Sequence, residues 1–308
     1  MSSIAADERA ARHAQGRVAV SSTAIPLTVS SIGHLAPPAE FSCFVHSVFA
    51  NSCNFTFDGA LLTLVVPRAG NGPTTLLLEH EPTRDLRTLF VTGTQLHCRK
   101  RVLRSERVLI QLGAAQTWQP LERSGLLPRR EIERRLHIAA QQLTQLRKTR
   151  ASVIDRSAAD LVASIAEACR VLDKDRVVRL VASLVGLGEG LTPAGDDFLV
   201  GLLAGLDGLA LDAAKRHFVD AIGLTLARLA HRTTDVAAHY LRLAARGHYS
   251  EVLDCLRDAL LCRHRCDLVE KALQGALDVG ATSGADMVTG LLAGLTAWLQ
   301  DETNLAQT

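Results

Sequence analysis

Aromatic residues are scarce in this chain of 308 residues, because phenylalanine, tryptophan and tyrosine together make up only 4% of it. An excess of either charge is missing too, since 34 lysines and arginines accompany 32 aspartates and glutamates. Binding of nucleic acid usually needs a basic surface and often aromatic rings that stack on bases. The basic run at 99–101, continued by Arg104 and Arg107, therefore indicates a solvated strand edge or turn, and we expect no nucleic-acid partner.

Long apolar runs are missing as well. Glycine or Asp207 interrupts them before they reach the ~20 residues that a membrane-spanning helix needs. The first residues, MSSIAADERAARHAQ, lack the basic start and apolar core of an export signal. The seven cysteines are odd in number and scattered, which favours reduced thiols over a disulfide framework. These absences predict a cytoplasmic protein with no membrane partner.

The chain has two halves of different texture. Up to about residue 112, short runs of β-branched and aromatic residues alternate with turn signals. After Pro128 the only proline is Pro193, and long segments place apolar residues three and four apart. We therefore expect an α+β fold, with a mostly antiparallel β domain over 1–125, in which the sheet could close as a small barrel, followed by an all-α domain over 126–308.

Individual elements follow from the same patterns. Asp58-Gly59 is a strong signal for a two-residue hairpin turn between two of the expected strands. Strands are expected at 41–49, 54–57, 60–66, 74–78 and 88–94. Helices are expected at 129–150, 156–172, 176–184, 193–210, 213–231, 234–246, 250–262, 268–279 and 284–299.

One segment of the second half is written twice. The stretch GEGLTPAGDDFLVGLLAGL at 188–206 recurs in shortened form as GATSGADMVTGLLAGL at 280–295. Eight residues of the first copy recur at a constant offset of 89, the difference between 284 and 195. Chance is a poor explanation for eight identities at one offset, so the pattern indicates an internal duplication.

Both copies are expected to begin a helix. In the first, the Thr192 hydroxyl would cap the helix and Pro193 would occupy its first position, where the missing N–H has no cost. In the second, Thr282 and Ser283 could cap in the same way.

Each of these helices carries an aspartate and two glycines on one face, four residues apart. They are Asp197, Gly201 and Gly205 in the first copy and Asp286, Gly290 and Gly294 in the second. A glycine costs a helix roughly 1 kcal/mol relative to alanine, so a compensating contact is expected. We predict that the two helices pack closely on their glycine faces and bring their first turns, with Asp197 and Asp286, to a common pocket.

A carboxylate at such a helix start has several uses. It can cap backbone N–H groups, bond to threonine hydroxyls, or bind a cation or a substrate amine. Asp196 directly precedes Asp197, and because adjacent carboxylates repel, their pairing favours a functional use. Asp196, Asp197 and Asp286 are thus the candidate catalytic residues. Asp196 and Asp197 could also hold Mg²⁺, although the sequence requires no cofactor.

A flexible glycine loop and a second polar cluster accompany the acids. The three glycines of 186–190 free the backbone to surround an anion at a helix start. Between the copies, Arg232 could hold a carboxylate or phosphate and His239 could move a proton, although a helix cap and a surface arginine explain the cluster equally. The candidate substrate-binding residues are Gly188, Gly190, Thr192, Gly195, Arg232, Thr233, Thr234, Thr282 and Ser283.

The motifs at 186–197, 232–238 and 280–286 resemble those of the AllH-type subunit family of oxamate carbamoyltransferase, a bacterial family formerly filed as a domain of unknown function. The resemblance covers the helical half, and the first ~120 residues match loosely. Two positions depart from the family pattern, since Glu189 stands where proline is expected and Ala194 where serine is expected.

The resemblance implies a subunit that works with partner chains to transfer a carbamoyl group between oxalurate and phosphate in the breakdown of allantoin, a purine catabolite. It implies that the Gly188–Gly190 loop and the Thr192 helix end hold phosphate or carboxylate, that Asp196 and Asp197 engage the carbamoyl amino group or Mg²⁺, and that Arg232 takes the substrate carboxylate. Backbone N–H groups with Thr282 or Ser283 would stabilise an oxyanion. The alternative is a non-catalytic scaffolding or small-molecule-binding subunit, in which the acids only cap.

Overall fold

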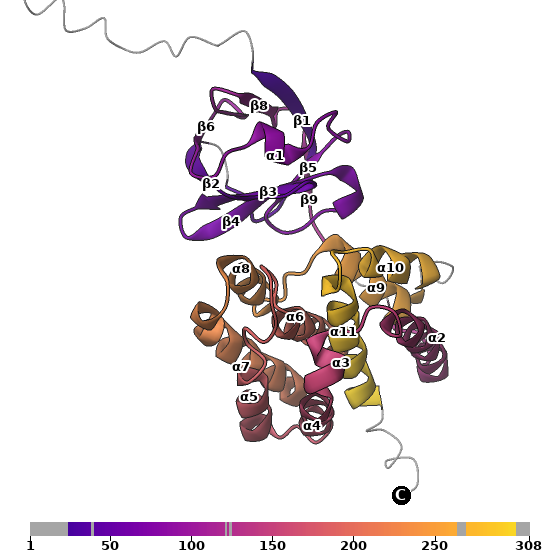
Figure 1. The fold of residues 1–308 in the computed structure, drawn as a ribbon. Coiled ribbons are helices and arrows are strands. Elements are labelled where there is room, and N and C mark those ends of the chain that lie inside the picture. The colour runs from indigo at the N-terminus through magenta and orange to yellow at the C-terminus, as the bar shows by residue number, and fades with distance from the viewer. Residues whose placement is uncertain (1–23, 38–39, 121, 123–124, 264–268, 300–308) are drawn as a thin grey trace, which may run out of the picture.

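The computed structural model describes the chain except residues 1–23, 38–39, 121, 123–124, 264–268 and 300–308. A β-barrel formed by the first third of the chain lies against one end of an all-helical region (Figure 1). The predicted order of a β unit followed by a helical unit is confirmed.

The barrel is a single sheet that closes on itself. Its order is β5-β4-β3-β2-β6-β7-β8-β1-β9, and pairing of β5 with β1 closes a ring of eight strands. The sheet is mixed rather than purely antiparallel, because β1 runs parallel to β8 and β4 runs parallel to β5. The strands are β1 (Ile25–Gly33), β2 (Phe41–Val48), β3 (Ser52–Phe57), β4 (Ala60–Val65), β5 (Thr75–Leu78), β6 (Gln95–Arg99), β7 (Val102–Arg104), β8 (Val108–Gln111) and β9 (Gln116–Trp118).

The expected hairpin joins β3 to β4. Phe57 pairs with Ala60, and the two turn residues have positive φ, 45° at Asp58 and 75° at Gly59. Such a turn matches the twist of the strands that it connects. Alternate residues such as Phe55 and Leu62 point into a barrel core that also contains the buried Cys43 and Cys53 thiols.

The strand expected at 88–94 is wrong. Residues Leu86–Leu89 form the short helix α1, and β6 begins only at Gln95. The Asp85 carboxylate starts this helix by accepting a hydrogen bond from the Arg87 N–H at 2.8 Å. Leu86, Leu89 and Phe90 follow the helical spacing and are buried in the barrel core, which outweighs the local strand propensity.

Nine helices were expected after residue 128, and each expected segment is helical within a few residues, the segment 156–172 as the helix 159–170. A short helix at 153–157 precedes it and was not expected. Ser152 begins this helix with a capping box, in which its hydroxyl and the Asp155 carboxylate each accept a backbone N–H. The helices are α2 (Arg129–Arg147), α3 (Val153–Ser157), α4 (Ala159–Arg170), α5 (Lys174–Ala182), α6 (Ala194–Leu209), α7 (Ala213–Leu229), α8 (Asp235–Ala244), α9 (Glu251–Leu261), α10 (Val269–Leu277) and α11 (Ser283–Leu299). Short 3₁₀ turns occur at Pro67–Ala69 and Ala230–Arg232.

The two related helices, α6 and α11, pack side by side and parallel through their glycines, as predicted (Figure 1). A Cβ atom on Gly201 would lie 1.9 Å from the Met287 carbonyl oxygen, and one on Gly290 would lie 2.0 Å from the Phe198 carbonyl oxygen. These contacts are equivalent under the offset of 89, so the duplicated helices are related by a local twofold. The pair forms the centre of the helical core, and Gly205 and Gly294 repeat the contact one turn later.

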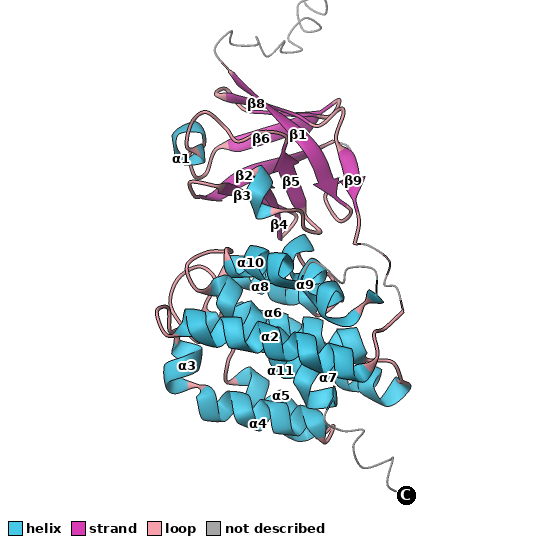
Figure 2. Cartoon of the chain, turned by 90° about the vertical axis from the view of Figure 1, so that its right-hand side faces the viewer, coloured by secondary structure: helices cyan, strands magenta, loops and turns pink. Residues whose placement is uncertain are grey.

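Helix α8 connects this core to the barrel (Figure 2). His239 accepts a hydrogen bond from the Leu61 N–H at 3.3 Å, and its other ring nitrogen lies 2.9 Å from the Thr74 hydroxyl oxygen. At the start of α9, the Glu251 carboxylate accepts two hydrogen bonds from Asn71, from the backbone at 2.8 Å and from the side chain at 2.9 Å. Polar contacts thus fix the barrel on the helical region. Among the described helices, none combines the length and apolar character needed to span a bilayer.

Candidate functional site

The site lies where the first turns of α6 and α11 meet. The hydroxyl oxygens of Thr192 and Ser283 lie 2.9 Å apart and join the two helix starts. The expectation that Thr192 caps α6 is wrong, because the helix begins at Ala194 and Pro193 occupies the cap position without a side-chain bond. The Thr192 hydroxyl therefore contributes to the junction between the copies.

Asp196 connects α6 to the segments before and after it. Its Oδ1 accepts a hydrogen bond from the Gly186 N–H at 3.0 Å, and its Oδ2 accepts one from the Thr233 hydroxyl. Burial raises its pKa, and the bonds from Thr233 and Gly186 oppose that rise. Both oxygens have protein donors, so Asp196 fixes the positions of the glycine loop and of the turn before α8.

Asp197 is buried without a cationic partner among the described residues. Desolvation raises the pKa of its carboxyl to about 7, and the negative charge of Asp286 contributes in the same direction. Hydrogen bonding by the Ser283 and Thr192 hydroxyls acts against this rise. Its Oδ2 atom is inaccessible to solvent and accepts no hydrogen bond from the described residues. Asp197 thus changes protonation near neutral pH and has a vacant acceptor atom.

Asp286 is fully buried at the equivalent place in α11 and has different partners. Its Oδ1 accepts hydrogen bonds from Arg147 Nη2 at 2.6 Å and from the Ser152 hydroxyl at 2.7 Å. Burial raises the pKa of Asp286, and the Ser152 bond and the Arg147 guanidinium counter that effect. Its Oδ2 also accepts no hydrogen bond from the described residues.

Arg147 is a site residue that the sequence analysis did not find. It is the last residue of α2, with a side chain 10% exposed, and it also contacts Asp155 at 3.2 Å and the Thr289 hydroxyl at 2.9 Å. It looked like one of several charged residues on a surface helix. Its separation of 139 residues from Asp286 left no local signal for the pairing.

The glycine loop before α6 adopts the conformations that its composition predicted. Gly186, Gly188 and Gly190 have φ of 76°, 119° and 90°, values that favour glycine. At Gly186 an added Cβ would lie 2.9 Å from the Arg232 carbonyl oxygen, whereas at Gly190 it would meet no atom within 4 Å. The stretch 188–191, including Glu189, is exposed, and its N–H groups donate no hydrogen bond within the described chain. Ala194 is buried at the helix start.

The other predicted residues divide between the site and its surroundings. Thr233 bonds to Asp196, and Thr234 caps α8 while its hydroxyl bonds to the Leu191 carbonyl. Thr282 accepts the Asp286 N–H through its carbonyl at 3.0 Å. Gly195 packs on the end of α5, where a Cβ would lie 2.1 Å from the Leu184 carbonyl oxygen. Arg232 is exposed and donates to none of the three carboxylates.

His239 and Tyr240 show how α8 brings the barrel to the acids. Burial lowers the pKa of His239 to about 4, so the ring is neutral and docks the barrel; the suggestion that it moves a proton has no support from this position. Tyr240 is 36% exposed; burial raises the pKa of its hydroxyl, the Thr63 hydroxyl lowers it, and the nearby Asp197 carboxylate raises it further. Sequence patterns gave no sign of Tyr240.

A metal site is not apparent in the described residues, which contain no group of three or more histidine, cysteine, aspartate or glutamate side chains suited to an ion. Two cavities, of about 240 and 540 Å³, lie in the barrel, and neither is lined by the acids. At the acids the structure places a junction of buried carboxylates beside the exposed loop 188–191 and Tyr240.

Comparison with known families gives an independent result. A family model described as oxamate carbamoyltransferase subunit AllH matches residues 184–295, and a model of the AllH family N-terminal domain matches residues 26–117. The chain belongs to the AllH family. No solved structure matches it significantly. The first match includes all the candidate site residues from Gly188 to Asp286, whereas Arg147 and Ser152 lie between the two matched ranges.

Membership of the AllH family confirms the resemblance and places the chain among subunits of a carbamoyltransferase. A subunit of oxamate carbamoyltransferase implies other subunits. The β-barrel corresponds to the family's N-terminal domain, and the duplicated helices belong to the region that carries the family description.

Proposed function

We propose that this chain takes part in carbamoyl transfer between oxalurate and phosphate, with partner subunits, and that Asp197 carries the transferred proton. The observation that carries the proposal is the buried Asp197 carboxyl at the meeting point of α6 and α11, whose Oδ2 accepts no hydrogen bond from the described residues and whose pKa burial raises to about 7. A group with a pKa near the working pH is suited to proton transfer in both directions. The family description supplies the reaction class.

The reaction includes the transfer of one proton. A phosphate oxygen attacks the carbamoyl carbon of oxalurate, and the bond from that carbon to the oxamate nitrogen breaks. The proton of the phosphate hydroxyl ends on that nitrogen, so the products are carbamoyl phosphate and oxamate. Ionised Asp197 would accept the proton from phosphate and, once neutral, donate it to the leaving nitrogen.

The surrounding groups have distinct tasks in this scheme. The free N–H groups of 188–191 would hold phosphate oxygens, as exposed amides of a glycine loop do. The Thr192 and Ser283 hydroxyls would orient the carbamoyl group, whose amino hydrogens match the vacant Oδ2 of Asp286. Asp196 would position the loop through Gly186. Holding two reactants in the correct geometry accounts for much of the catalysis in such transfers.

Glu189 and the substrate carboxylate shape the electrostatics of the loop. Glu189 is exposed within 188–191 and adds negative charge next to the proposed phosphate site. Arg232 adjoins the loop through its backbone at Gly186 and remains the proposed partner of the substrate carboxylate, with an exposed side chain that is free to turn toward it.

Substitution Asp197→Asn tests this function in the assembled complex. The assay measures oxalurate-dependent carbamoyl phosphate formation, and co-purification of the partner subunits measures assembly. We expect an intact complex whose kcat falls roughly 100-fold or more, because general acid–base groups contribute about 10²–10⁴-fold. Asp220→Asn, at an exposed position of α7, is the matched control. Normal activity of the Asp197→Asn complex would instead support the scaffolding alternative.

A further inference from the structure

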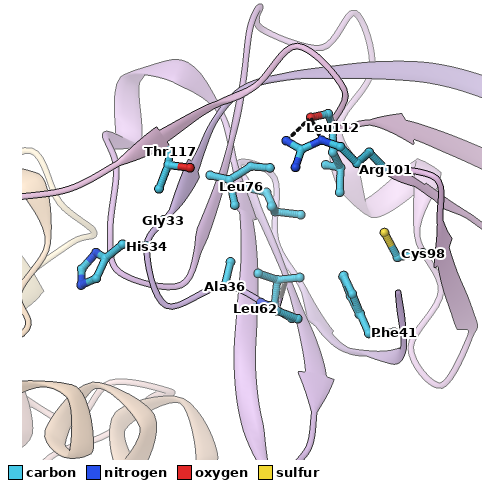
Figure 3. A pocket seen from close by; sticks show the side chains of 12 residues that line it. Gly33, His34, Ala36, Phe41, Leu62, Leu76, Cys98, Arg101, Leu112 and Thr117 are labelled. Atoms are coloured by element: carbon cyan, nitrogen blue, oxygen red, sulfur yellow. Dashed lines mark hydrogen bonds between the residues drawn. The ribbon is translucent and has the colours of Figure 1, made fainter. Parts of the chain in front are cut away.

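A cavity lies in the barrel, and none of the three acids lines it. Its volume is about 240 Å³, and Figure 3 shows the side chains that line it, which come from β1 and the loop after it, from β2, β4, β5, β6 and β9, from the turn after β6, and from Leu112. Its walls combine apolar side chains, among them Phe41, Leu62 and Leu76, with an about equal share of polar surface. The polar side chains include Arg101, Thr117 and His34. A cavity that joins apolar side chains to a few oriented polar groups is typical of a small-molecule site.

Arg101 has unused hydrogen-bonding capacity in this cavity. Its Nε and Nη2 donate to the Leu112 carbonyl at 3.2 and 2.8 Å, as Figure 3 shows. The Arg101 carbonyl in turn accepts the Leu112 N–H at 2.9 Å, so the two residues hold each other. A guanidinium has five N–H groups, and both on Nη1 have no partner within the described chain. Arg101 is an exposed residue at the cavity, and its bonds to Leu112 hold the guanidinium in place with donors to spare.

The backbone holding Arg101 is unfavourable for its residue type. Lys100 and Arg101 form the two-residue turn between β6 and β7 with φ of 51° and 58°. Asparagine or glycine would relieve such a turn, whereas residues with longer side chains are strained in it. Retaining arginine there despite this strain is consistent with a use for its side chain.

The local charge favours an anion. Burial raises the pKa of the Cys98 thiol in the cavity wall, and two nearby charges also affect this pKa. Arg101 lowers it by more than Glu40 raises it, so the positive charge dominates there. A single guanidinium fork matches a carboxylate, whereas a phosphate is usually held by several donors. The volume is below the range of about 300–1,000 Å³ that is usual for drug-sized ligands, so the ligand is small.

We propose that this cavity binds a small monocarboxylate with a short apolar tail, whose carboxylate pairs with Arg101 and whose tail lies against Phe41, Leu62 and Leu76. This site is independent of the function proposed for Asp197. It gives the barrel a binding role in addition to its contact with the helical region.

The test uses the full-length chain and a series of straight-chain acids from acetate to hexanoate, with binding measured by calorimetry and ligand-observed NMR. Butyramide serves as the neutral match for butyrate, and inorganic phosphate tests the other class of anion. Arg101→Met removes the donors, and Lys100→Met is the matched control in the same turn. Ala36→Leu partly fills the cavity without changing any charge.

We expect saturable binding that strengthens with chain length until the cavity is full. Arg101→Met should weaken butyrate binding about tenfold or more, because the variant loses hydrogen bonds from a charged donor to the carboxylate, while Lys100→Met should change it less than twofold. Butyramide and phosphate should bind at least about tenfold more weakly than butyrate. The proposal is overturned if no acid binds, if butyramide binds equally well, or if both turn variants have the same effect. Should Arg101→Met fail to fold, unchanged butyrate binding by Ala36→Leu overturns it.

Discussion

Replacing Gly201 with alanine tests the packing on which the geometry of the site depends. The added Cβ would lie 1.9 Å from the Met287 carbonyl oxygen and 2.7 Å from its carbon, where such contacts essentially never fall below 3.0 Å. Both obstructing atoms belong to the backbone of α11, so no side-chain rotation relieves the contact. The helices must separate locally by about 1 Å to restore ordinary packing distances.

Two opposing terms set the magnitude of the effect. Alanine favours the helix over glycine by about 1 kcal/mol. Overpacking of a well-packed core costs about 1–3 kcal/mol, and a gap of 0.5–1 Å further forfeits roughly a quarter to a half of the dispersion energy of the neighbours. The contact term exceeds the helix term, and we expect Gly201→Ala to lower the free energy of unfolding by about 2 kcal/mol. Gly290→Ala should behave alike, because its Cβ would lie 2.0 Å from the Phe198 carbonyl oxygen.

Urea unfolding followed by far-ultraviolet circular dichroism measures these changes. Gly275→Ala in α10 is the matched control, since a Cβ there meets no atom within 4 Å. It should stabilise the protein by up to about 1 kcal/mol. If Gly201→Ala is as stable as Gly275→Ala, the close packing of α6 on α11 is refuted.

Three further predictions concern charge. The pKa of Asp197 is raised to about 7, so between pH ~4 and about 7 the folded state keeps a proton that the unfolded state has lost. The contribution of Asp197 to stability is therefore complete below pH ~4 and is lost as the pH rises through about 7. In the unsubstituted protein this effect lowers the free energy of unfolding by on the order of 3 kcal/mol between these pH limits, and Asp197→Asn should remove that decline. Unfolding of Asp197→Asn and of the control Asp220→Asn is measured from pH ~4 to ~8, which spans the two pKa values. Parallel curves for the two variants would contradict the prediction. Arg147→Met should lower the free energy of unfolding by about 3–5 kcal/mol near neutral pH, because it leaves the buried Asp286 carboxylate without its cation, and by less in acid, where Asp286 is protonated. In thermal unfolding, adding Asp286→Asn should partly restore stability. If it does not, the ion pair is not the cause of the loss. Glu251→Gln should weaken the contact of α9 with the barrel by about 1 kcal/mol, because it removes the charge that accepts the two hydrogen bonds from Asn71. Limited proteolysis should then cut faster between the barrel and the helical region. An unchanged rate of cleavage would contradict the prediction.

Local patterns predicted most of the fold. The Asp58-Gly59 turn, the helical spacing after Pro128 and the repeated glycines each carry their structural consequence within a few neighbouring residues. The strand expected at 88–94 failed because burial of Leu86 and Leu89 depends on the rest of the barrel. The parallel pairing of β1 with β8 likewise joins segments far apart in the chain, and no short pattern encodes it.

The candidate site was predictable in part. The repeat showed that Asp197 and Asp286 would share a helix junction, because glycines at the same offset require a common contact. Their partners could not be read from the repeat, since Arg147 and Ser152 come from an unrelated segment and Tyr240 depends on how α8 meets the barrel. Residue roles set by tertiary neighbours lie beyond what spacing alone can show.

The duplication gives the two acids equivalent backbones and unequal surroundings. Burial raises the pKa of both carboxyls, but Asp286 accepts hydrogen bonds from Arg147 and Ser152 that oppose the rise, while Asp197 has hydroxyl neighbours and the repulsion of Asp286 and Asp196. Negative charge on Asp286, which the Arg147 guanidinium favours, contributes to the raised pKa of Asp197. Pairs of carboxyl groups whose environments separate their pKa values are a common way to divide the tasks of anion and proton carrier. Loss of symmetry around a symmetric helix pair is thus what would allow this junction to carry out proton transfer.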